Sequence, residues 1–251
     1  EIAGELHAEV VAPSCGWTTL RPASAPAQVA NTLVAGPCLL ENALLRFTFN
    51  DKGEIVSILD KETGRELATG PCNSFKMYKD VPTNWDAWDI DSTYKANPVP
   101  LDAPATFEVL STGPLVATLR VERRLNESWM TQEISLRRDS RRLDFETVVE
   151  WRERHKLLKV AFPVDIHANE AVHEIQFGHI RRPNHASRPF DADRFEVANH
   201  KWTALMEENR GCAVLNDCKY GVNVVGQSIN LTLLRAPLAP DMTADQGTQR
   251  F

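Results

Sequence analysis

Two tryptophans and two of the acidic side chains lie close together in residues 84–91. Trp85 and Trp88 are each followed directly by an aspartate, Asp86 and Asp89. Aromatic rings can cover the C–H face of a sugar ring, and carboxylates accept hydrogen bonds from its hydroxyl groups. The pattern therefore fits carbohydrate binding. The alternative interpretation is a loop anchored by its tryptophans, with aspartates that cap its turns.

The acidic residues of this stretch are not expected to catalyse hydrolysis by themselves. Glycoside hydrolysis needs two carboxylates at a set separation across the scissile bond, and acids this close in one loop are usually solvated or capping. No G-x-S-x-G motif, Cys/His signature or phosphate-binding glycine loop is present, so no catalytic residue is assigned. No HxH or HExxH spacing occurs, so no metal site is predicted among the seven histidines, His7, His155, His167, His173, His179, His185 and His200.

A second group of polar residues lies near the end of the chain, over 234–247. Arg235, Asp241 and Asp245 would face a common ligand if these loops meet at one end of a sheet. The alternative is ordinary turn chemistry, in which residues 216–221 close a hairpin.

The elements that must position these residues are strands. From Leu143 to Trp151 apolar and charged residues alternate, which is the period of a half-buried antiparallel strand. Residues 50–53 carry turn signals between two such runs and predict a hairpin. Many strands without helical periodicity indicate an all-β sandwich or barrel. Further runs with strand character are 44–49, 55–59, 75–78, 115–121, 130–136, 174–177, 213–215 and 229–234.

Residues 80–104 differ, because they form about 25 residues without strand periodicity. A loop of this length in a compact domain is usually functional or disordered, and this one is too aromatic for disorder.

The composition excludes several classes of protein. With 28 Lys and Arg against 34 Asp and Glu over 251 residues, the formal net charge is −6. An acidic chain lacks the basic face that nucleic acid requires. No apolar run approaches the length of a membrane span.

The first residues suggest a separate unit. Residues 9–12 and 17–21 predict the last two strands of a preceding small β domain, and 22–27 form a linker by composition. The predicted domains are therefore 1–30 and 31–251. The first residue is Glu1 and the first methionine is Met77, so we expect a piece of a larger enzyme.

The five cysteines show no paired spacing. An odd number without a C-x-x-C motif predicts reduced, mostly buried thiols and hence a cytoplasmic protein.

Five motifs in fixed order resemble the C-terminal β region of glycoside hydrolase family 38 α-mannosidases, of the bacterial and cytosolic class II branch. They are Asn84-Trp-Asp-Ala-Trp-Asp-Ile-Asp91, Arg194-Phe-Glu-Val197 with His200-Lys-Trp202, Leu215-Asn-Asp-Cys-Lys-Tyr-Gly221, Leu233-Leu-Arg-Ala-Pro237 with Pro240-Asp241, and Ala244-Asp-Gln-Gly247. The turn at 61–66 extends the resemblance. Residues 184–190 and 206–211 depart from the family pattern.

The resemblance implies a retaining α-mannosidase whose zinc-type metal, nucleophile and acid/base carboxylate reside in an absent N-terminal catalytic domain. It implies an antiparallel β-supersandwich like the galactose-mutarotase fold for this chain, which should be inactive alone and carry no cofactor. It also places the loop around Asp245, Gln246 and Gly247 close to the sugar cleft, where these residues would contact the leaving-group side or support the residues that do. Homo-oligomerisation of the full-length enzyme is left open.

Two alternatives remain. One is a stand-alone carbohydrate-binding or mutarotase-like module, in which His167, His179 or His200 would meet Glu174 or Glu196 on a concave face. The other is a purely structural module between domains.

Overall fold

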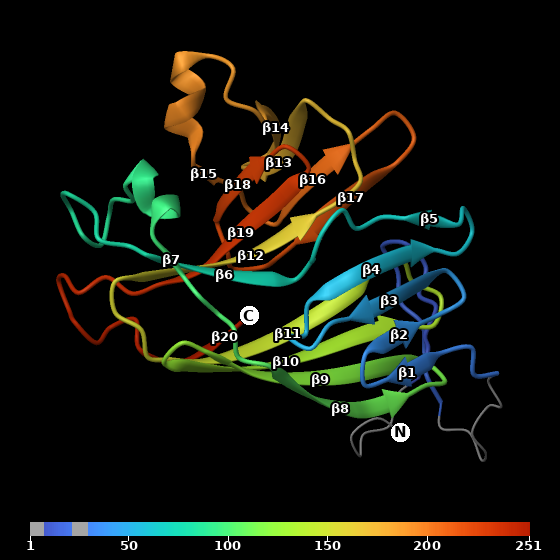
Figure 1. Ribbon diagram of the computed structural model, residues 1–251. Coiled ribbons are helices and arrows are strands. Elements are labelled where there is room, and N and C mark those ends of the chain that lie inside the picture. The colour runs from blue at the N-terminus through green and yellow to red at the C-terminus, as the bar shows by residue number, and fades with distance from the viewer. Residues whose placement is uncertain (1–7, 22–29) are drawn as a thin grey trace.

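The computed structural model describes residues 8–21 and 30–251 (Figure 1). Over these residues the chain forms strands β1 to β20 and two short 3-10 helices, and the paired strands run antiparallel. The all-β antiparallel class expected from the sequence is confirmed.

Two five-stranded sheets lie mostly in the lower part of Figure 1. The first has the order β1-β2-β3-β4-β5, with bounds Val34–Gly36, Leu39–Glu41, Leu45–Phe49, Ile55–Asp60 and Arg65–Glu66. The second has the order β20-β11-β10-β9-β8, with bounds Gly247–Arg250, Leu143–Trp151, Ser128–Arg137, Val116–Leu125 and Ala105–Thr112.

Two further sheets form the upper half of Figure 1. The six-stranded sheet has the order β15-β18-β19-β12-β6-β7, with bounds Val197–Ala198, Gly221–Val225, Ser228–Arg235, Lys156–Pro163, Ser74–Lys79 and Pro98–Val99. The four-stranded sheet has the order β14-β13-β16-β17, with bounds Gly178–Pro183, Glu170–Ile175, Trp202–Met206 and Gly211–Leu215.

One apolar core connects the sheets. On β10 the residues at even positions, such as Met130 and Ile134, are buried, while the odd positions between them are exposed or half-buried. Leu158 and Leu231 from the six-stranded sheet belong to the same buried cluster. Successive strand side chains point to opposite faces, so the alternation in the sequence determines which face enters the core.

The turn between β3 and β4 shows how one hairpin is specified. The side-chain oxygen of Asn50 accepts hydrogen bonds from the N–H groups of Lys52 and Glu54, each at 3.0 Å. Gly53 has a φ of +76°, which favours glycine. A Cβ atom there would lie 2.5 Å from Cγ1 of Val121, so the turn also packs closely against β9.

Both 3-10 helices, η1 (Ser92–Ala96) and η2 (Pro189–Arg194), lie near a buried polar network on one face of the six-stranded sheet. Lys159 of β12 donates to the Glu196 carboxylate at 2.7 Å, and Tyr94 of η1 donates to the same oxygen at 2.6 Å. Burial lowers the pKa of Lys159, although Glu196 opposes this effect. Burial also raises the pKa of Tyr94. The network therefore ties η1 and the segment after η2 to the sheet.

The expectation for the first residues stays a prediction. The structure describes a turn but no strand over residues 8–21. Apolar residues at strand spacing make a strand only where a neighbouring strand pairs with them. The linker over 22–27 lies outside the described residues, and the division at residue 30 stays a prediction.

Two local expectations need correction. Residues 216–221 do not close a hairpin, because they lead from β17 in the four-stranded sheet to β18 in the six-stranded sheet. The strand expected over 174–177 ends earlier, at Ile175, and Phe177 lies fully exposed in the turn with a φ of +61°.

The prediction of mostly buried thiols is also wrong. Cys15, Cys38 and Cys218 are exposed, Cys212 is half-buried, and Cys72 is buried; all five are free. The exposed cysteines lie in turns or bends. Among the described residues, no helix is long and apolar enough to cross a membrane.

Candidate functional site

The Trp/Asp loop, residues 84–91, follows β6 and precedes η1. Its turn is closed by the N–H groups of Trp88 and Asp89, which donate to the carbonyl of Trp85 at 2.8 and 2.9 Å. Trp85 adopts a φ of +56°, which is uncommon for a residue with a side chain. Both indole side chains stay largely in solvent, with Trp85 73% and Trp88 74% exposed. The loop therefore presents two aromatic rings outward instead of anchoring itself with them.

Arg235, at the end of β19, holds the Trp/Asp loop in place. Its Nε donates to the buried carboxylate of Asp80 at 2.7 Å. Its two terminal nitrogens donate to the carbonyls of Asp86 and Ala87, both at 3.3 Å, and of Asp89 at 2.6 Å. A planar guanidinium can reach several acceptors at once. Arg235 therefore acts as a brace for the loop, and these groups are engaged within the protein.

Asp86 connects the Trp/Asp loop to the segment after β19. Its Oδ2 accepts hydrogen bonds from the N–H groups of Leu238 at 2.8 Å and Ala239 at 3.1 Å, and lies 3.2 Å from Nε2 of His155. Burial alone would raise the pKa of Asp86, but these hydrogen bonds lower it on balance. The ionised carboxylate is thus a structural acceptor.

A hollow of about 500 Å³ lies between the Trp/Asp loop and the segment 236–247, and we name it the loop hollow. Its lining includes Ala87 at the tip of the loop, together with Arg235, Asp241 and Asp245. Apolar residues complete it, namely Leu233, Leu234, Pro237, Ala239, Pro240 and Ala244, with Gln249. The carboxylates of Asp241 and Asp245 belong to exposed residues, so they are accessible to a ligand.

Two polar residues of segment 236–247, Asp241 and Gln246, are engaged within the protein. Asp241 accepts hydrogen bonds through Oδ1 from the N–H and hydroxyl groups of Thr243, at 2.9 and 3.0 Å, and the N–H bond in particular lowers the pKa of Asp241. Gln246 donates to the carbonyl of Glu153 at 2.6 Å. It therefore closes the segment against the chain before β12 and does not line the loop hollow.

The sequence-derived candidates thus divide into three groups. Arg235, Asp241 and Asp245 meet around the loop hollow. Trp85, Trp88 and Asp89 lie on the adjoining loop without lining the hollow, and Asp86 and Gln246 serve to hold loops.

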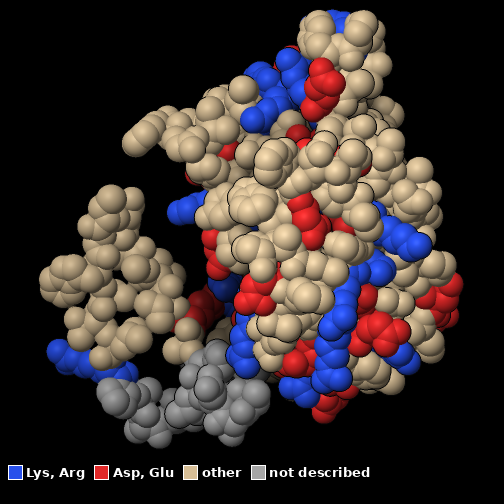
Figure 2. All heavy atoms as spheres, turned by 90° about the vertical axis from the view of Figure 1, so that its left-hand side faces the viewer, with Lys and Arg blue, Asp and Glu red and all other residues tan. Residues whose placement is uncertain are grey.

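Both segments lie on one side of the molecule, where the Trp/Asp loop is teal and segment 236–247 is red in Figure 1. Figure 2 views this side and shows acidic and basic side chains scattered among uncharged ones. Such a face offers no broad field of one sign to a charged partner, and it suits a neutral ligand.

Two residues of this region carry no sequence signal that singles them out. Asp80 directly follows a strand and is the buried partner of Arg235, with its Oδ1 lacking a hydrogen-bond partner in the described residues. His155 lies in the turn between β11 and β12, and its contact with Asp86 spans 69 positions. Both depend on pairing between distant segments, which spacing along the chain does not reveal.

The chemistry available here is hydrogen bonding and aromatic contact. Carboxylates of Asp241 and Asp245 can accept from hydroxyl groups, and the indoles of Trp85 and Trp88 can cover C–H groups. Across residues 8–21 and 30–251, no group of three or more His, Cys, Asp and Glu is arranged to hold a metal ion.

The histidine and carboxylate pair of a mutarotase-like site is only partly assembled. Glu174 lies opposite His179 in the β13–β14 pair, and the N–H of His200 donates to the carbonyl of Glu174 at 3.0 Å. Glu174 lines a cavity between the sheets, but no histidine of the described residues does. His167 contacts Gln227, and Glu196 belongs to the network with Lys159 and Tyr94.

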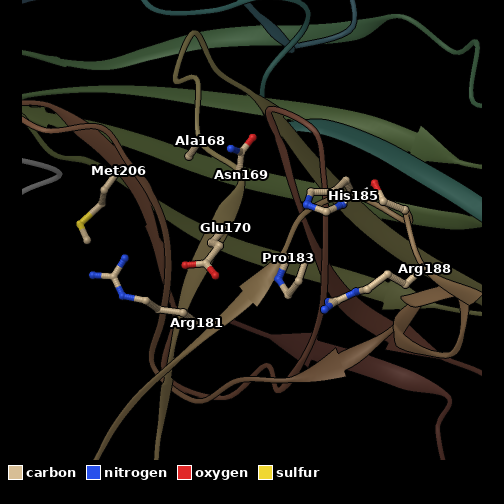
Figure 3. A pocket seen from close by; sticks show the side chains of 9 residues that line it. Ala168, Asn169, Glu170, Arg181, Pro183, His185, Arg188 and Met206 are labelled. Carbon is tan, nitrogen blue, oxygen red and sulfur yellow. Dashed lines mark hydrogen bonds between the residues drawn. The ribbon is translucent and has the colours of Figure 1, made fainter. Parts of the chain in front are cut away.

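Another hollow, of about 670 Å³, lies over β13 and β14 (Figure 3). Glu170, Arg181 and Arg188 surround it from two strands and the following loop. Arg188 is engaged with Asp191, its Nη2 lying 3.0 Å from Oδ1. None of the candidates from the sequence lines this hollow.

Comparisons with known proteins relate this chain to one family. The family model described as the glycosyl hydrolases family 38 C-terminal domain matches residues 40–243. Alpha-mannosidase 2C1 of Homo sapiens is 37% identical over 253 residues, covering 96% of this chain and 24% of that protein. Alpha-mannosidase G of Dictyostelium discoideum is 37% identical over 225 residues, covering 86% of this chain and 21% of that protein. The chain thus spans about a quarter of the length of these relatives.

A solved structure supports the fold. A glycosyl hydrolase family 38 protein from Enterococcus faecalis superposes with a TM-score of 0.73 at 16% identity, covering 88% of this chain and 30% of that chain. At this identity the likeness shows the fold alone.

Proposed function

Since the chain belongs to the family of glycosyl hydrolase family 38 C-terminal domains, we propose that it is the C-terminal β region of an α-mannosidase that removes terminal α-D-mannosyl residues with retention. In this proposal the chain packs on the catalytic domain of the same polypeptide and shapes the sugar cleft. The observation that carries it is the loop hollow, where Asp241 and Asp245 lie beside a braced loop with two exposed tryptophans.

In this proposal the surface contacts the leaving group of the substrate. The rings of Trp85 and Trp88 would cover sugar C–H groups, while Asp241 and Asp245 would accept from hydroxyls. Because Arg235 and Asp86 fix the loop in advance, little conformational entropy is lost when a ligand binds. These residues would position the substrate without taking part in bond cleavage.

The catalytic carboxylates and a zinc-type metal are assigned to the catalytic domain. Retaining hydrolysis requires two carboxyl groups facing each other across the glycosidic bond.

A cytoplasmic location forms part of the same proposal. The five cysteines are all free, which fits a reducing compartment. The expected partners are the catalytic domain and a mannoside, with no role for nucleic acid or a membrane.

The decisive experiment uses the full-length enzyme with Trp88→Ala or Asp241→Asn. On an α-mannose oligosaccharide, KM should rise about tenfold, because an aromatic or hydrogen-bonding contact with the leaving sugar is lost. On an aryl α-mannoside, whose leaving group is no sugar, KM should change little. Steady-state kinetics on the two substrates measures the difference.

Trp129→Ala is the matched control, because Trp129 is also an exposed tryptophan but lies on the outer face of β10. It should leave both substrates unaffected. If the Trp88 and Asp241 variants turned over the oligosaccharide like the wild type, the loop would be a structural element between domains. Turnover of an aryl α-mannoside by the isolated chain would contradict the assignment of catalysis to the other domain.

A further inference from the structure

A third cavity, of about 640 Å³, opens between the six-stranded sheet and the sheet that contains β10 and β11, and we name it the inter-sheet cavity. Phe145 of β11 and Phe162 of β12 line it from opposite sheets, with ring centroids 6.1 Å apart in a T-shaped arrangement. Trp202 of β16 also lines it. The cavity thus has the size and aromatic lining of a small-molecule site.

The floor of the inter-sheet cavity carries three buried polar side chains. Asn73 donates to the Oε1 of Gln132 at 2.7 Å, and Gln132 donates to the hydroxyl of Thr147 at 2.9 Å. None of the three is more than 4% exposed. An acceptor hydroxyl keeps its own hydrogen, so Thr147 can donate to a ligand. Polar groups in an otherwise apolar core need such partners.

The charges around the inter-sheet cavity balance. The acidic residues that line it are Glu146, Glu174 and Asp217, and the basic ones are Arg142, Lys201 and Lys219. With three of each sign, the site favours neither an anion nor a cation. It favours a neutral molecule with many hydroxyl groups and an apolar face.

We propose that the inter-sheet cavity binds a neutral hexopyranose. The sugar C–H face lies against the aromatic rings of Phe145, Phe162 and Trp202, and its hydroxyls reach Thr147 on the floor and Lys201 at the rim. The site is separate from the loop hollow, although Leu233 borders both. The inference is independent of the proposed hydrolytic function and concerns binding alone.

The test titrates the 251-residue chain with methyl α-D-mannopyranoside and with D-glucose, followed by NMR of the tryptophan indole N–H signals. A Trp202→Phe variant assigns the Trp202 signal. A neutral sugar should shift this signal in a saturable way, and sodium glucuronate should do so more weakly. Lys201→Met changes an exposed residue and should weaken binding several-fold.

Thr147→Val removes the floor hydroxyl while keeping the side-chain shape, and it should weaken binding about tenfold. Thr131→Val on the outer face of β10 is the matched control and should bind like the wild type. Shifts at Trp85 and Trp88 without a shift at Trp202 would overturn the inter-sheet site while supporting the loop hollow. Sugar affinity equal to that of the wild type in both Thr147→Val and Lys201→Met would also overturn the inter-sheet site.

Discussion

Arg235 shows how much a single side chain contributes to the candidate site. Its guanidinium bridges the Asp80 carboxylate and three carbonyls of the Trp/Asp loop, whereas lysine offers one compact charge on a flexible stem. Arg235→Lys should lower the free energy of unfolding by about 2 kcal/mol, and Arg235→Met by about 3–5 kcal/mol, because the buried Asp80 loses its partner. Urea unfolding followed by circular dichroism measures both.

Arg46→Lys is the control for this prediction. Arg46 pairs with Glu41 at 2.6 Å but is 47% exposed, and exposed pairs contribute about 0–1 kcal/mol. Equal losses for Arg46→Lys and Arg235→Lys would show that Arg235 does not brace the loop.

The Asp86 carboxylate makes a pH-dependent contribution. Its pKa is lowered in the folded protein, so the ionised form is favoured there, and the stabilisation is complete above the unfolded pKa of about 3.9. It is lost as the pH falls through the lower folded pKa. Asp86→Asn should therefore cost about 1–2 kcal/mol near neutral pH and progressively less below about pH 4. Urea unfolding of the wild type and of Asp86→Asn, at neutral and at acidic pH, measures this difference in the free energy of unfolding. A difference that does not change with pH would contradict this account.

At the scale of the elements, the β3–β4 turn depends on Gly53. Gly53→Ala places a Cβ where φ is positive and 2.5 Å from Val121, so we expect a loss of about 2–3 kcal/mol from strain and overpacking. Gly64→Ala is the matched control, because Gly64 has a φ of +69° with open space around it. Its loss should be about 1 kcal/mol. Thermal unfolding of both variants separates the packing contribution from the backbone strain.

The two short helices depend on the pair formed by Lys159 and Glu196. Lys159→Met leaves the largely buried Glu196 carboxylate without its cation, and breaking a buried pair costs about 3–5 kcal/mol. Adding Glu196→Gln removes the uncompensated charge, so the double variant should recover part of this loss. A double-mutant cycle in urea measures the coupling. Strict additivity of the two single changes would contradict a coupled pair.

The sequence predicts single elements better than their partners. Alternation located β3, β4, β9, β10, β11 and β19 closely, because each has one buried face. Over 9–12 and 17–21 the structure describes no strand, and the small β domain expected there stays a prediction. The sequence also could not distinguish a hairpin from a crossing between sheets at 216–221, since turn residues serve both.

The same limit applies to the site at the scale of the whole molecule. Polar density identified Arg235, Asp241 and Asp245, which the fold does bring together. Spacing could not show that Arg235 and Asp86 are engaged by the protein itself, because their contacts join residues about 150 positions apart. The inter-sheet cavity was missed for this reason too, since its lining comes from three of the sheets.

The uneven burial of the five cysteines provides a built-in measure of how the whole molecule opens. Cys15, Cys38 and Cys218 should react at once with a thiol reagent such as Ellman's reagent. The half-buried Cys212 should react more slowly, and the buried Cys72 only when the sheets separate. Burial raises the pKa of Cys72 to about 12 and also raises the pKa of Cys212, so neither forms much reactive thiolate while folded. The rate of the slow labelling phase would therefore report how often the core opens, without any added probe. A sugar bound in the inter-sheet cavity should make this phase slower.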